Sequence, residues 1–140
     1  MKSPFPFCAA YAFALSLLIL SYHLTPVLLD LFVAQPATLG THTTVWMNWH
    51  AAGCAFVGLV NVQACCWTDA KARRGIAIAS AGIFGIWCAQ NLTYSLTPLF
   101  TGAMWLHVLA CGLAAVASAA FALRPGGTGQ SSDATIRRAD

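Results

Sequence analysis

Residues 100–123 have the sequence FTGAMWLHVLACGLAAVASAAFAL, and this stretch decides the fold class. It contains no Asp, Glu, Lys or Arg, and most of its residues are Ala, Leu and Val. An apolar run of roughly 20 residues is long enough to cross a bilayer as a helix. The run shows no alternation of apolar and polar residues, which argues against a β-strand. We therefore expect a transmembrane helix here.

Three further stretches are similarly apolar, at about 8–33, 45–67 and 75–97, and Asp30 is the only charged residue within them. Only 8% of the residues are charged, whereas a soluble domain carries about 25%. So few charges exclude an ordinary soluble enzyme and a nucleic-acid binder with a basic face. The sequence predicts an all-α membrane protein, a four-helix up-down bundle whose surroundings are the lipid bilayer.

The basic residues predict the orientation of the bundle. The two loops at 34–44 and 98–100 contain neither Lys nor Arg. Because Lys and Arg are retained on the cytoplasmic side, both termini and the middle loop should be cytoplasmic. The basic residues on that side are Lys2, Lys71, Arg73, Arg74, Arg124, Arg137 and Arg138.

The chain divides into a transmembrane domain over 1–124 and a tail over 125–140. The tail is polar and rich in Gly and Ser, so we expect it to be disordered and cytoplasmic. Lys2 ahead of an apolar run also fits a secretory signal peptide. No small-x-small cleavage site follows this run, so we expect the first span to be retained.

Two short patterns occur twice. YHLTPVL at 22–28 resembles YSLTPLF at 94–100, which suggests two related helical hairpins. The second pattern is Met-x-x-His-x-x-small-Cys, and its spacing places the three side chains on one helical face. It predicts two imidazoles at similar depth in the exoplasmic half of the bundle. The residues are Met47, His50 and Cys54 in one copy, and Met104, His107 and Cys111 in the other.

Polar residues concentrate in the same half, where ionisable groups inside a membrane suggest function by default. We expect them to line a histidine-centred pocket. The expected catalytic residues are His23, Asp30, His50 and His107, and the expected substrate-binding residues are Asn48, Trp49, Asn91, Tyr94 and Trp105. The two tryptophans also suit the role of anchors at the membrane interface.

These residues favour a membrane enzyme that acts on a lipophilic small molecule by acid–base chemistry. Isomerisation, cyclisation and hydration all fit, and the sequence has no P-loop, G-x-G-x-x-G or nucleophile elbow. The expectation requires no cofactor.

Two alternatives stay open. The first is a transition-metal protein holding copper or zinc through a Cys₂His₂ set, or a b-haem between two histidines. The second is an accessory subunit of a membrane complex. Glycines in the spans also favour close helix contact or a homo-oligomer. The metal set would be His50, Cys54, His107 and Cys111, and the haem would use His50 and His107.

Overall fold

The structure is a computed structural model that describes residues 3–21, 24, 31–32, 41–98 and 100–124, with the backbone alone at 41–44 and 46. No β-strand occurs among the described residues. The expected all-helical class and the expectation of four helices are confirmed for this part of the chain. The helices are α1 (Phe5–Ser21), α3 (Thr41–Cys66), α4 (Ala70–Ser95) and α5 (Met104–Ala122).

Three of the helices are long and apolar enough to cross a membrane, over Met47–Cys66, Ala70–Ser95 and Met104–Ala122. All four helices expose large apolar side chains. Water would disfavour an apolar surface of this extent, whereas acyl chains accept it. These features indicate an integral membrane protein. Each helix has at least one such side chain that is 67–68% exposed: Leu17, Phe56, Ile86 and Val116.

α1 is shorter than the predicted span over 8–33. It begins at Phe5 and ends at Ser21, and its 17 residues extend about 26 Å. Leu31 and Phe32 lie in a turn, so the helix does not continue to residue 33 as predicted. The predicted span contains a proline, Pro26, and a proline lacks the N–H group that a continuing helix needs. Residues 22–23, 25–30 and 33 lie outside the described residues.

The other helices also differ from the predicted bounds at their starts. α4 begins five residues before the predicted 75, because the Asp69 carboxylate accepts hydrogen bonds from the backbone N–H groups of Lys71 and Ala72. α5 begins at Met104 rather than at 100. Thr101, three residues earlier, instead bonds to the segment that follows α1, since its N–H donates to the carbonyl of Phe32 (2.9 Å).

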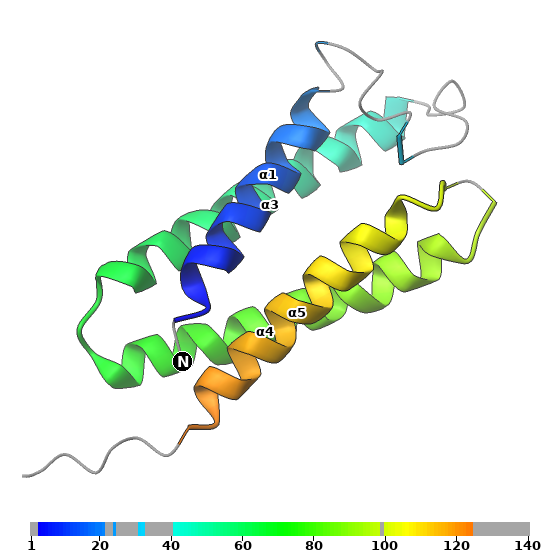
Figure 1. Cartoon of the computed structure of the whole chain (residues 1–140). Coiled ribbons are helices and arrows are strands. Elements are labelled where there is room, and N and C mark those ends of the chain that lie inside the picture. The colour runs from blue at the N-terminus through cyan, green and yellow to red at the C-terminus, as the bar shows by residue number, and fades with distance from the viewer. Residues whose placement is uncertain (1–2, 22–23, 25–30, 33–40, 99, 125–140) are drawn as a thin grey trace, which may run out of the picture.

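The helices associate as two pairs. α1 packs along α3, and α4 packs along α5, while α3 with α4 and α1 with α5 share far fewer contacts (Figure 1). Gly58 of α3 permits the close approach of α1, because a Cβ atom there would lie 3.1 Å from ring atoms of Phe13. Gly112 of α5 similarly faces Cys88 of α4, whose Sγ would lie 3.6 Å from such a Cβ atom.

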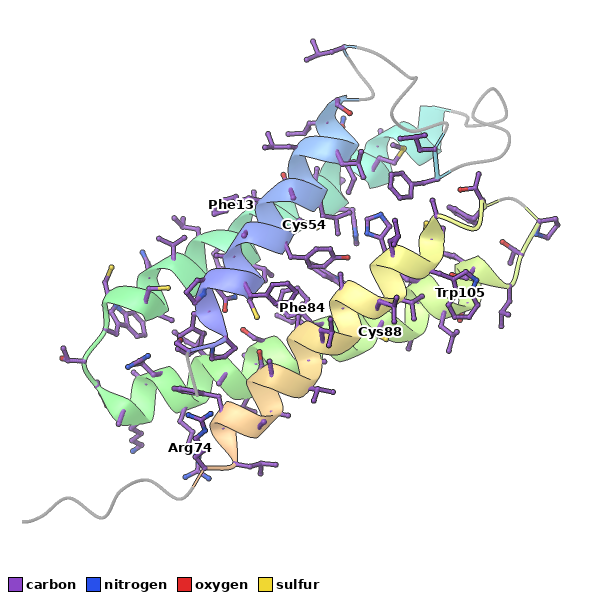
Figure 2. The ribbon with its side chains drawn as sticks, in the orientation of Figure 1. Phe13, Cys54, Arg74, Phe84, Cys88 and Trp105 are labelled. Carbon is purple, nitrogen blue, oxygen red and sulfur yellow. The ribbon has the colours of Figure 1, made fainter. Side chains whose placement is uncertain are left out.

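Two apolar clusters fill the space between the pairs. The buried residues at the centre come from all four helices and include Phe84, which is labelled in Figure 2. The other cluster lies where α1 and α4 begin and α5 ends. A buried hydrogen bond also joins the pairs, because Ser80 Oγ of α4 donates to Asn61 Oδ1 of α3 (3.3 Å). The central cluster is Cys8, Ala12, Val57, Phe84, Cys111 and Ala114, and the end cluster is Phe5, Ala64, Ala77 and Ala122.

Candidate functional site

A tyrosine of α1 meets a histidine and a cysteine of α5 between the two helix pairs. The Tyr11 hydroxyl lies 3.1 Å from Nδ1 of His107 and 3.2 Å from Sγ of Cys111. His107 and Cys111 are four residues apart on α5, so one face of the helix presents both to the same hydroxyl. His107 is half-buried and Cys111 is fully buried.

α4 adds an amide to this group. Asn91 Nδ2 donates to Cys111 Sγ at 3.6 Å. Three helices therefore supply the four side chains, which we call the Tyr11 cluster: Tyr11, Asn91, His107 and Cys111. Of these, His107, Asn91 and Cys111 belong to the residue sets predicted from the sequence.

Aromatic rings surround the Tyr11 cluster and connect it to the second histidine. The Phe32 ring lies against His107, with centroids 4.7 Å apart. From Tyr11 the contacts run to Phe84 (6.1 Å) and then edge-on to Trp87 (5.3 Å). The Trp87 ring in turn contacts His50 of α3 (5.5 Å).

Each imidazole thus contacts a helix of the other pair. His50 of α3 contacts Trp87 of α4, and His107 of α5 contacts Tyr11 of α1. Their neighbours differ, although the local sequence pattern is the same. His50 packs on an indole, whereas His107 has a hydroxyl partner. Among the described residues, no hydrogen bond or ring contact joins the two imidazoles directly.

The predicted metal set does not gather around a common point. No group of three or more His, Cys, Asp or Glu side chains that could hold a metal ion occurs among the described residues. Cys54 is fully buried on α3, and Cys111 bonds to Tyr11 and Asn91. The expected copper or zinc site therefore finds no support in this part of the chain, and the haem alternative, which uses His50 and His107 alone, stays a prediction.

The remaining predicted residues do not join the Tyr11 cluster. The Tyr94 hydroxyl accepts a hydrogen bond from Gln90 Nε2 (2.8 Å), and its ring stacks on Phe100 (4.9 Å). Asn48 and Trp49 line a shallow depression on the outer face of α3, and Trp49 is 72% exposed.

Trp105 is also exposed, near the start of α5 (Figure 2). The expected catalytic residues His23 and Asp30 lie outside the described residues.

Tyr11 is the one member of the cluster that lies outside the residue sets predicted from the sequence. None of the sequence patterns described above includes it. A signal was present, because a tyrosine hydroxyl in the middle of a membrane span must find a partner inside the protein. Tyr11 is the only tyrosine of α1.

The arrangement can relay a proton. A thiol, a hydroxyl and an imidazole lie in hydrogen-bonding order as Cys111, Tyr11 and His107. The hydroxyl can accept from the thiol while it donates to the unprotonated Nδ1 of the imidazole. The apolar rings of Phe32 and Phe84 lie beside this relay.

No known protein family, no curated protein and no solved structure matches this chain, so the functional argument rests on the geometry of the Tyr11 cluster.

Proposed function

We propose that the chain is a small integral membrane enzyme that carries out acid–base chemistry on a lipophilic small molecule at the Tyr11 cluster. The observation that carries the proposal is the 3.1 Å hydrogen bond between the Tyr11 hydroxyl and His107 Nδ1, set among aromatic rings inside a membrane protein. A polar side-chain network in such surroundings is costly to bury and is typical of a working site.

The chemistry follows from the groups present. An imidazole can both accept and donate a proton near neutral pH, and a hydrogen-bonded hydroxyl can carry that proton onward. The rings of Phe32 and Phe84 give these groups apolar surroundings. Isomerisation, cyclisation and hydration of a lipophilic compound all require the movement of a proton between two positions. His107 is the group that exchanges a proton with the substrate. Tyr11 positions the imidazole and returns a proton to it.

The proposal includes an orientation in the membrane. The helices form an up-down bundle, with both termini and the turn between α3 and α4 on the cytoplasmic side. The support is the position of Lys71, Arg73 and Arg74 in the first turns of α4, and of Arg124 after α5.

Labelling with a membrane-impermeant maleimide on intact cells tests this orientation. The variants are made in a background that lacks Cys65 and Cys66. Leu96→Cys, at the far end of α4, should react at once. Thr68→Cys, in the turn before α4, should react only after the cells are permeabilised. The reverse order would contradict the proposed orientation.

Deuterium incorporation tests the chemistry without a known substrate. Membranes that contain the protein are incubated in D₂O, and their lipophilic extract is analysed by mass spectrometry. We expect a deuterated or isomerised compound that forms with the wild-type protein and disappears with His107→Asn and with Tyr11→Phe. Thr93→Val is the control, because it removes an exposed hydroxyl of α4 that bonds only to the carbonyl of Ala89 among the described residues, and it should retain the product. An extract identical to that of membranes without the protein would contradict the proposal.

A further inference from the structure

Positive charge gathers at the opposite end of the molecule from the turn between α4 and α5. Lys71, Arg73 and Arg74 follow the first residue of α4, and Arg124 follows the last turn of α5. Figure 2 shows Arg74 at this end, beside the end of α5. The N-terminal turn of a helix carries a partial positive charge, and the three cations there outnumber the single carboxylate of the Asp69 cap.

Two of these guanidinium groups share one aromatic support. The Arg73 guanidinium carbon lies 5.5 Å from the ring centroids of both Phe5 and Phe121. That of Arg124 lies 5.5 Å from the Phe121 centroid. Phe5 is fully buried and contacts Phe121 edge-on, at 5.3 Å between centroids. The rings therefore fix the place of Arg73, which is half-buried, whereas Arg74 is exposed.

Arg73 has no anionic partner among the described residues. The only acid among them is Asp69, whose Oδ1 accepts hydrogen bonds from the backbone N–H groups of Lys71 (2.8 Å) and Ala72 (3.3 Å). The Arg73 Nε atom is buried and has no hydrogen-bond partner in the described part of the chain. A buried guanidinium N–H without an acceptor is unfavourable, so its place calls for an oxygen ligand.

We propose that Arg73 and Arg124 bind a phosphate group, presented by an anionic lipid of the membrane. A guanidinium offers parallel N–H donors that match two phosphate oxygens, and two guanidinium groups on one ring can hold one phosphate between them. Bilayer phosphates lie at the depth where a transmembrane helix begins, and anionic lipids attract such basic positions. Inorganic phosphate shares this chemistry, so the test separates the two sources.

Native mass spectrometry of the full chain in detergent, titrated with phosphatidylglycerol, tests the proposal. We expect one tightly bound lipid, whose dissociation constant rises about tenfold in Arg73→Gln and in Arg124→Gln. Arg74→Gln is the matched control, since it removes the same charge from a neighbouring exposed position. It should raise the dissociation constant by no more than about twofold.

Two further measurements complete the design. Arg73→Lys keeps the charge but loses the planar fork, so it should bind more weakly than the wild type even where Arg73→Gln does not fold. A parallel titration with inorganic phosphate identifies the source. Binding of phosphatidylglycerol but not of free phosphate supports a lipid headgroup, while competition by millimolar free phosphate assigns the site to the free ion and overturns the lipid assignment. Equal effects of Arg73→Gln and Arg74→Gln, or no bound lipid at all, would overturn the site itself.

Discussion

Tyr11 and His107 are 96 residues apart in the sequence, yet the hydroxyl of one is 3.1 Å from Nδ1 of the other. The contact joins α1 to α5, two helices that otherwise share few contacts. It therefore both closes the bundle and creates the polar centre of the proposed site. The variants below separate these two effects.

Tyr11→Phe should lower the free energy of unfolding by about 0.5–1.5 kcal/mol, the usual contribution of a hydrogen bond between membrane helices. The change leaves the ring in place but removes the partner of His107 and Cys111. Unfolding in mixed detergent and SDS measures the loss, and nitrogen NMR of the imidazole reports whether Nδ1 has changed its bonding.

Tyr94→Phe is the control for this experiment, because its hydroxyl bonds only to exposed Gln90. It should change stability by less than about 0.5 kcal/mol. Equal losses in the two variants would show that the Tyr11 hydroxyl has no special place in the fold.

Gly58→Ala should unfold about 1–2 kcal/mol more easily than Gly53→Ala. Both glycines lie on α3, so the gain in helix propensity is the same. The new methyl group at Gly58 would meet the Phe13 ring at 3.1 Å and push α1 away, whereas at Gly53 it meets nothing within 4 Å. Equilibrium unfolding of the two variants checks the difference. Equal stabilities would mean that α1 and α3 do not pack closely at this point.

Asn61→Ala should destabilise the bundle by about 1–2 kcal/mol, because the buried Ser80 hydroxyl loses its acceptor. In a double-mutant cycle with Ser80→Ala, the coupling energy should be about 0.6 kcal/mol. Gln63→Ala, at an exposed position of the same helix, provides the control. A coupling energy of zero would contradict the contact between α3 and α4.

The six cysteines should divide into reactive and protected groups. Cys65 and Cys66 are exposed, while Cys8, Cys54 and Cys111 are buried. With N-ethylmaleimide, mass spectrometry of the folded protein in detergent should show modification of the first two alone from these five. The buried three should react only after denaturation. Modification of Cys111 in the folded protein would contradict the closed packing around Tyr11.

The sequence was sufficient to predict the helices but not all of their limits. Composition located all four apolar stretches, since length and lack of charge are what a bilayer selects. The start of α4 was predicted too late, because charged residues were assumed to end a span. The helix instead starts before these charges, because Asp69 caps it. Arg73 lies within the helix, where its guanidinium group packs on aromatic rings.

The sequence predicted His107, Cys111 and Asn91 of the candidate site, but not Tyr11. Helical spacing correctly placed His107 and Cys111 on one face, because that relationship is local. The partner of both, Tyr11, depends on how α1 is rotated and shifted against α5. That register depends on how the two helix pairs pack around Phe84, which contacts Tyr11 and belongs to the central cluster.

The short turn over residues 67–69 is the covalent link between the α1–α3 pair and the α4–α5 pair. Most contacts between helices fall within the two pairs, so each pair can insert into a bilayer as one packed unit. A chain divided in this turn, ahead of the Asp69 cap, would give two fragments. They would reassociate through the two apolar clusters and the Ser80–Asn61 hydrogen bond between the pairs. The chain can therefore be divided at this turn without removing a contact inside either helix pair.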